Sequence, residues 1–262
     1  MKKFAILIAV VILFSSCSLS VFPKTRRTVS EGAYSELSNR KQGWGFRRTE
    51  NGPEFTQNQI NLMKQYHCIY KENTKSKTIY LTFDEGYENG YTSLILDTLR
   101  EKGVKAAFFV TGPYVKSNPQ LILRMAKEGH IIGNHTLSHP SMPDVSDSDL
   151  LKDLSELDRL IYGICQRHCT FLRPPKGEYS ERTLSLTHNA GYTNVFWSQA
   201  YVDWNDKSNA NDAFKKIISD IQPGCVLLLH AVSKGNADAL GNIIDYLHKE
   251  GYTFKTLNQY KV

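Results

Sequence analysis

From residue 76 to the end of the chain, short apolar runs rich in β-branched and aromatic residues alternate with longer amphipathic segments. Short runs of this composition predict buried strands, whereas apolar residues that recur at helical spacing predict helices. The predicted strands cover residues 78–83, 105–110, 131–134, 170–173, 193–197 and 226–229. The predicted helices cover residues 92–102, 119–128, 147–167, 180–190, 211–221 and 237–249.

Alternation of strands and helices predicts an α/β fold, in which helices cover a parallel sheet. The number of strand–helix units within residues 76–262 fits a distorted, incomplete (β/α) barrel better than two separate domains. In such barrels the chemistry collects at the carboxyl ends of the strands. We therefore look for a site in the residues that follow each strand.

The start of the chain has a different pattern. A basic Met1-Lys2-Lys3, an apolar run to Phe14 and small residues around Cys17 predict an export signal or a membrane or lipid anchor over residues 1–22. Cleavage and secretion, an uncleaved anchor and lipidation at Cys17 all remain open, and each places the protein outside the cytoplasm. Residues 23–75 lack clear periodicity and predict an irregular arm, partly packed on a catalytic domain of residues 76–262.

The net charge of +6 comes from the N-terminal part of the chain. Residues 1–50 hold nine Lys and Arg against three Asp and Glu, whereas residues 51–262 hold 23 of each. Nucleic-acid binding requires a basic face, so the neutral domain argues against it. We expect a monomer. Cys165 and Cys169 could pair or bind a metal, but their spacing also suits apolar residues at a helix end, which we favour.

Polar residues follow several of the predicted strands, and they are Asp84 with Glu85, His135 with His139, Arg173 with Lys176, Asp203 with Trp204, and His230. Each has an ordinary explanation by itself. Asp84-Glu85-Gly86 could be a turn, Arg173 a surface ion-pairing residue, and His230 a core histidine. Their joint placement at the same end of successive strands instead predicts an active site.

Five motifs occur in a fixed order: TFDEG at 82–86, HTLSH at 135–139, RPPKG at 173–177, DW at 203–204 and LLH at 228–230. With these motifs, residues 75–260 resemble the polysaccharide deacetylase (NodB-homology) domain of carbohydrate esterase family 4. The longer stretches TFDEGYENGYT, EGHIIGNHTLSH and LLLHAVSKGNADAL resemble its delta-lactam-biosynthetic branch, which acts on N-acetylmuramic acid in spore-cortex peptidoglycan.

The resemblance implies roles for individual residues. Asp84 would be the general base, kept ionised by Arg173, and His230, oriented by Asp203, would be the general acid. The backbone N–H of Lys176 would hold the oxyanion. Trp204 and Leu228 would line an apolar slot for the acetyl methyl group. The Lys176 side chain would bind an anionic substrate group or remain solvated.

The resemblance also implies a divalent metal ion, Zn²⁺ first, with Mg²⁺, Co²⁺ or Mn²⁺ as alternatives. Its ligands would be His135, His139 and Glu85, with open positions for water and substrate. The family has Asp where this chain has Glu85, whose carboxylate lies about one C–C bond, ~1.5 Å, further out. Ligation by Glu85 therefore stays open.

The predicted function is de-N-acetylation of N-acetylmuramic acid on the peptidoglycan glycan strand, leading to muramic δ-lactam. An N-acetylmuramoyl-L-alanine amidase would be the functional partner that removes the stem peptide first. Two alternatives are deacetylation of N-acetylglucosamine units in peptidoglycan or a chitin-like polymer, and a catalytically silent wall-binding module. The intact set of acidic, basic and histidine residues argues against a silent module.

Overall fold

The computed structural model describes residues 34, 36–204 and 209–261. The predicted export or anchor segment, residues 1–22, lies outside these residues. Among the described residues, no helix is both long enough and apolar enough to cross a membrane.

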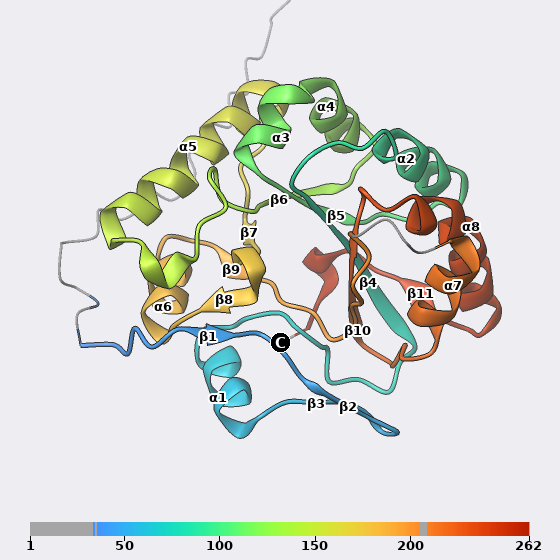
Figure 1. Ribbon diagram of the computed structural model, residues 1–262, viewed down its shortest axis with the longest axis horizontal. Helices are drawn as coiled ribbons and strands as arrows, with labels where there is room; N and C mark the ends of the chain where they lie inside the picture. Colours follow the sequence, from blue (N-terminus) through green and yellow to red (C-terminus); the bar gives the residue numbers. More distant parts are fainter. Residues whose placement is uncertain (1–33, 35, 205–208, 262) are drawn as a thin grey trace, which may run out of the picture.

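One curled, mostly parallel sheet forms the centre of the molecule (Figure 1). Its strands follow the order β10 (Cys225–His230), β4 (Thr78–Glu85), β5 (Ala107–Val110), β6 (Ile131–Asn134), β7 (Phe171–Leu172) and β9 (Thr193–Asn194), while β11 (Thr253–Phe254) pairs with the start of β4. The chain after β9 meets β10 again through a parallel bridge between Gln199 and Leu227. The predicted incomplete barrel is thereby confirmed.

Helices surround the outside of this sheet (Figure 1). They are α2 (Thr92–Glu101), α3 (Gly112–Ser117), α4 (Pro119–Lys127), α5 (Asp147–Cys165), α6 (Glu181–Asn189), α7 (Ala210–Ile218) and α8 (Lys234–Lys249). All except α3 coincide with predicted helices. The six residues of α3 are too few to show a helical repeat in the sequence. Short 3₁₀ turns are η1 (Met142–Asp144), η2 (Pro175–Gly177) and η3 (Leu257–Gln259).

Strand β4 is buried along its whole length. Because successive side chains of a strand point to opposite faces, Leu81 and Phe83 join the core under the helices, whereas Tyr80 joins the core inside the curl. Asp84 therefore points to the inside, and Glu85 points to the helix-covered side. The strand runs two residues beyond the predicted end at residue 83, so both acids belong to it.

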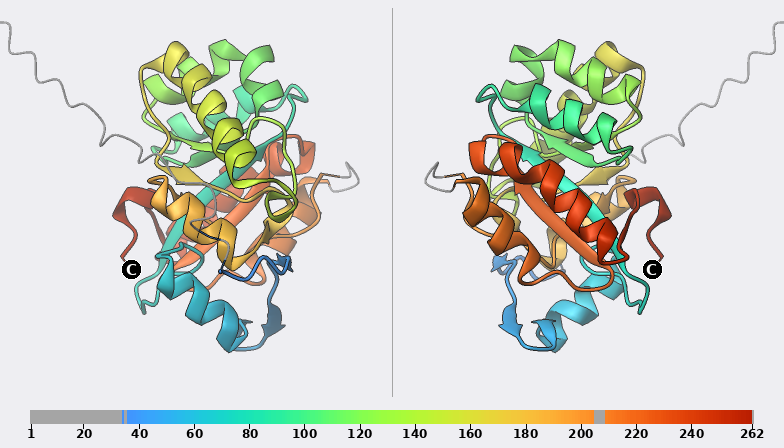
Figure 2. Two further views of the ribbon diagram at one scale, coloured as in Figure 1. Left: turned by 90° about the vertical axis from the view of Figure 1, so that its left-hand side faces the viewer. Right: turned by 90° about the vertical axis from the view of Figure 1, so that its right-hand side faces the viewer.

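The N-terminal arm is more regular than the sequence predicts. It contains β1 (Gln42–Gly43), the hairpin β2 (Arg47–Thr49) and β3 (Gly52–Glu54), and α1 (Gln57–Gln65). Strand β1 pairs with β8 (Glu178–Tyr179), and Trp44 stacks on Phe196 with 4.6 Å between ring centroids. In Figure 2 the arm, coloured blue to cyan, lies at the opposite end of the molecule from α3 and α4.

Candidate active site

Asp84 and Arg173 form a buried ion pair at the carboxyl end of β4. The Oδ1 atom of Asp84 lies 2.7 Å from Nη1 of Arg173. The guanidinium group is fully buried, donates to the Thr82 hydroxyl at 2.9 Å and lies over the Phe109 ring, 4.2 Å from its centroid. Burial raises the pKa of Asp84, but the nearby cationic groups, Arg173 first and also His230, together outweigh burial, so the pKa falls below its usual value. Asp84 is therefore held as an ionised carboxylate.

His230 occupies the matching position on the neighbouring strand. It is the β-sheet partner of Asp84 in the parallel register of β10 and β4, so the two side chains lie on the same face. The Nδ1–H of His230 donates to Asp203 Oδ1 at 2.7 Å, and its backbone N–H donates to Asp203 Oδ2 at 2.8 Å. Burial lowers the pKa of His230, but Asp203 outweighs it, and the pKa is raised. Asp203 thus favours the imidazolium form.

His135 follows β6 and has a different partner. Its Nδ1–H donates to the backbone carbonyl of Arg173 at 2.8 Å, while Nε2 lies 3.6 Å from Asp84 Oδ2. Burial lowers the pKa of His135 to about 4, and burial also lowers the pKa of His139. The two imidazole rings meet edge to face, with centroids 4.9 Å apart. Near neutral pH, His135 is therefore an uncharged imidazole with Nε2 as acceptor.

The predicted substrate residues surround these groups to different extents. Trp204 is 54% exposed and its ring packs edge to face against His230, 5.0 Å between centroids. Leu228, two residues before His230 on the same face of β10, is buried. Burial is the main cause of the lowered pKa of His139, and the hydrogen bond from Lys41 is the main cause of the lowered pKa of Asp144. Lys176 in η2 adds a smaller lowering of both pKa values, so its ammonium group lies within electrostatic range of both residues.

Glu85 is not brought to the histidine pair. It lies on the outer face of β4, fully buried, and neither carboxylate oxygen has a hydrogen-bond partner. Burial raises its pKa well above the usual value, and the neighbouring Glu88 and Asp84 raise it further. The environment of Glu85 thus favours the neutral acid, whereas the environment of Asp84 favours the charged carboxylate.

The comparisons with known proteins agree with this geometry. The sequence pattern of the polysaccharide deacetylase family matches residues 71–195. Over 227 residues the chain is 45% identical to the peptidoglycan-N-acetylmuramic acid deacetylase PdaA of Bacillus subtilis, which covers 85% of this chain and 86% of that protein. The chain belongs to the polysaccharide deacetylase family.

Two further comparisons extend the relationship. A peptidoglycan-N-acetylglucosamine deacetylase of Bacillus cereus is 34% identical over 76% of this chain and 73% of its own length. The solved structure of Bacillus subtilis PdaA, a family 4 carbohydrate esterase, superposes with a TM-score of 0.83 and 43% identity, covering 86% of this chain and 98% of that one. The fold predicted from the motifs is the fold of this polysaccharide deacetylase.

Polysaccharide deacetylases of this family depend on a metal ion in general. Among residues 34, 36–204 and 209–261, however, no three His, Cys, Asp or Glu side chains are grouped so that they could hold a metal ion. His135 and His139 offer two imidazoles, but the predicted third ligand, Glu85, points to the other face of β4. The predicted three-ligand set is therefore not assembled in this arrangement.

Several residues that support the site cannot be recognised from the sequence. Asn236 donates to Asp203 Oδ2 and accepts from the Tyr201 hydroxyl, so it helps to fix the partner of His230. Thr82 lies inside the TFDEG motif, and its hydroxyl accepts a hydrogen bond from Arg173. The motif alone does not reveal this contact, because it depends on the Thr82 side chain pointing to the inside of the sheet. Asp153 on α5 accepts hydrogen bonds from the Leu137 and Ser138 backbone N–H groups, between the two histidines. It gives no signal in the sequence, because it is one of several acids on that helix. Cys165 and Cys169 are not joined to each other by a disulfide.

Proposed function

We propose that this polysaccharide deacetylase hydrolyses the acetamide of N-acetylmuramic acid in peptidoglycan. The observation that carries the proposal is the pairing in register of Asp84 and His230, two groups that neighbouring charges hold in opposite protonation states. Amide hydrolysis requires such a pair, because one group must accept a proton from water and the other must protonate the leaving nitrogen.

Asp84 acts as the base. Its carboxylate, kept ionised by Arg173, takes one proton from a water molecule as the water oxygen bonds to the acetyl carbon. The resulting oxyanion is stabilised by the backbone N–H of Lys176, whose positive φ of 59° turns the peptide within η2. The base and its supporting cation are thus both supplied by buried residues.

His230 acts as the acid. The C–N bond breaks as the imidazolium gives its Nε2 proton to the nitrogen, leaving a free amine and acetic acid, which loses its proton to solvent as acetate. The proton held by Asp84 then returns to His230 through solvent and restores both groups. Asp203 holds the ring through Nδ1 and stabilises its charged form. Trp204 and Leu228 on this side accommodate the acetyl methyl group.

His135 and His139 are the residues proposed to contact the metal ion. Because Nδ1–H of His135 is bonded to a backbone carbonyl, the lone pair of Nε2 is left to coordinate a metal ion, an arrangement common among metal-bound histidines. A bound ion, Zn²⁺ first or Mg²⁺, Co²⁺ or Mn²⁺, would polarise the acetyl carbonyl. The proton transfers above are assigned to side chains of this chain, Asp84 and His230.

The muramic preference rests on similarity and on charge. The Bacillus subtilis relative is named for N-acetylmuramic acid, and that sugar carries a lactyl carboxylate. Lys176, close enough to His139 to affect its pKa, supplies a cation at a suitable place for such a group. The amine released could then close on the lactyl carboxyl to form muramic δ-lactam, once an N-acetylmuramoyl-L-alanine amidase has removed the stem peptide. Action as a monomer outside the cytoplasm is part of the same proposal.

Mass spectrometry of muropeptides tests the function directly. Peptidoglycan, intact or treated with an amidase, is incubated with the enzyme and digested. Loss of acetyl from muramic acid, greater after amidase treatment, is the expected result. Loss from glucosamine would instead support the second candidate, which the Bacillus cereus relative favours. No loss from either sugar would support a silent wall-binding module.

A further inference from the structure

The segment that joins the two site histidines has a strained backbone. Thr136 and His139 both have positive φ angles, 67° and 57°. Such angles are uncommon for any residue with a side chain and more so for a β-branched one, and they cost on the order of 1–3 kcal/mol each. Strain of this kind persists only where surrounding contacts hold the backbone.

The strongest of these contacts comes from helix α5. Asp153 Oδ1 accepts a hydrogen bond from the Leu137 backbone N–H at 2.6 Å. Asp153 Oδ2 accepts from both the backbone N–H and the hydroxyl of Ser138, at 3.1 and 2.6 Å. The Leu137 carbonyl on the other side of the segment accepts from the Gly112 N–H at 3.1 Å, where a Cβ on Gly112 would lie only 2.4 Å from that oxygen. The middle of the segment is therefore held from two sides.

Neutral groups hold the ends of the segment. The Thr136 N–H donates to the Asn134 side chain at 2.8 Å, and the His139 N–H donates to the Thr136 hydroxyl at 2.9 Å. Both of these contacts are made by residues close in sequence, because Asn134 ends β6 and Thr136 belongs to the segment itself. Asp153 is different, because it is charged and belongs to a separate element. Charge-assisted hydrogen bonds are roughly twice as strong as neutral ones.

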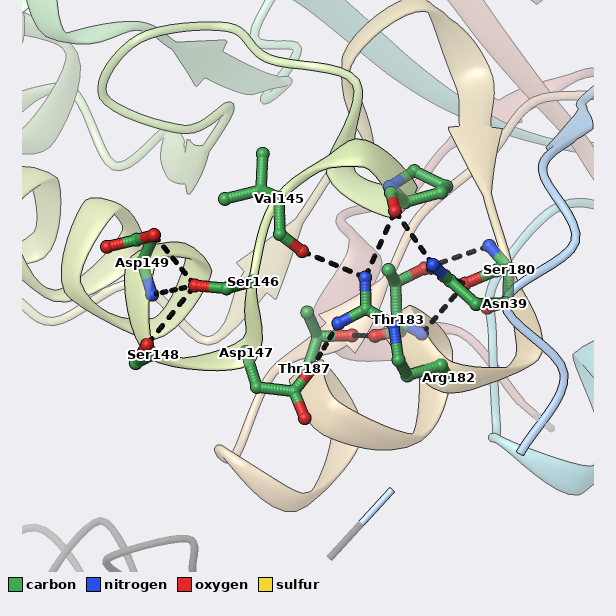
Figure 3. A network of polar contacts seen from close by, with 11 residues as sticks. Asn39, Val145, Ser146, Asp147, Ser148, Asp149, Ser180, Arg182, Thr183 and Thr187 are labelled. Atoms are coloured by element: carbon green, nitrogen blue, oxygen red, sulfur yellow. Dashed lines mark hydrogen bonds and ion pairs between the residues drawn. The ribbon is translucent and has the colours of Figure 1, made fainter. Parts of the chain in front are cut away.

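Helix α5 is itself anchored at its N-terminus, as Figure 3 shows. Arg182 of α6 forms an ion pair with Asp147 and donates to the carbonyl oxygens of Pro143 and Val145, at 3.2 and 2.9 Å. Ser146 caps the helix by accepting from the Asp149 N–H. The carboxylate of Asp153 is thus carried by an element whose start is fixed to the rest of the barrel.

We propose that Asp153 is a positioning residue that sets the relative orientation of His135 and His139. Its hydrogen bonds go to Leu137 and Ser138, and it acts by fixing these two peptide groups between the histidines. The inference rests on the proposed function for its activity and Zn²⁺ measurements, whereas its hydrogen-exchange measurement needs neither substrate nor metal.

The test compares Asp153→Asn with Glu156→Gln in the full chain. Both substitutions remove one negative charge from α5, but only the first disturbs the contacts described above, because an amide offers one acceptor and turns two donors towards the segment. The expected results for Asp153→Asn are faster hydrogen exchange at Leu137 and Ser138, Zn²⁺ binding weakened about 10–100-fold, and a similar loss of kcat with KM little changed. Glu156→Gln should match the parent in all three.

A failure of the proposed function would leave the exchange result intact while removing the activity result. Exchange and Zn²⁺ affinity in Asp153→Asn equal to those in Glu156→Gln would overturn the positioning role. If Asp153→Asn does not fold, Ser138→Ala decides the question, because it keeps the carboxylate and removes only the 2.6 Å hydroxyl bond. We expect about a fivefold weakening of Zn²⁺ binding from this change, and no weakening would overturn the proposal.

Discussion

His135 and His230 lie at the same end of the sheet, and both donate a hydrogen bond through Nδ1, yet their pKa values shift in opposite directions. The partner of His135 is a neutral carbonyl, so burial dominates and the ring stays uncharged. The partner of His230 is the buried carboxylate of Asp203, which outweighs burial and favours the charged ring. One hydrogen-bond partner therefore decides whether a buried histidine is suited to bind a metal or to donate a proton.

Asp84 is the neighbour that the two histidines share, and its removal should have the largest effect. Asp84→Asn removes the proposed base and leaves the buried Arg173 without its counter-charge. We expect a loss of turnover of about 10³-fold or more, and a loss of unfolding free energy of about 3–5 kcal/mol. Deacetylation assays and urea denaturation measure the two effects. Turnover within tenfold of the parent would show that Asp84 is not the base.

His230→Ala should have the next largest effect, because it removes the acid and leaves the His135 side of the site intact. The expected loss of turnover is about 10²-fold or more. Metal content, measured by mass spectrometry of the metal-loaded protein, should not change. A loss of metal would contradict the comparison, since it would make His230 a ligand like His135. His135→Ala should lose metal, and it serves as the matched control.

The comparison depends on strand geometry that the sequence predicts only in part. The barrel rule correctly brings Asp84 and His230 to one end of the sheet, because the motifs end successive strands. It does not predict the face of each side chain, which depends on where β4 ends. With the strand ending at residue 83, both acids would follow it in a loop, whereas the observed strand includes both and separates them.

Other misses have similar physical causes. Helix α1 was not predicted because it buries only Gln59, Leu62 and Met63, which is too little for an apolar repeat. Asp153 and Asn236 act through contacts between elements far apart in sequence, and a single sequence gives no sign of such contacts. Arg173 was predicted from its motif, but its stacking on Phe109 depends on the curl of the sheet.

Asp203→Asn should turn the environment of His230 into one resembling that of His135. A neutral partner no longer offsets burial, so the pKa of His230 should fall. The acid must be protonated to act. The fall in activity at high pH should therefore begin at a lower pH in Asp203→Asn than in the parent. We expect a smaller loss at the optimum than for His230→Ala, about tenfold. The pH dependence of kcat/KM measures the shift, and an unmoved alkaline limb would mean that another group is the acid.

Glu85 extends the comparison to a buried group without any hydrogen-bond partner, and its substitution should have the smallest effect. The raised pKa of Glu85 favours the neutral acid, which Gln imitates in shape and charge. The carboxyl of the unfolded chain ionises at lower pH than the buried one. The contribution of Glu85 to stability is therefore fully present below its unfolded pKa and is lost as pH rises through its folded pKa. Glu85→Gln should remove this dependence, so its unfolding free energy relative to the parent should rise between pH 4 and pH 8.

Denaturation in the presence of a chelator measures the difference, and Zn²⁺ titration should give the same affinity for both proteins. A weakened affinity, restored in Glu85→Asp, would mean that Glu85 turns to the inner face and serves as the third ligand when metal binds.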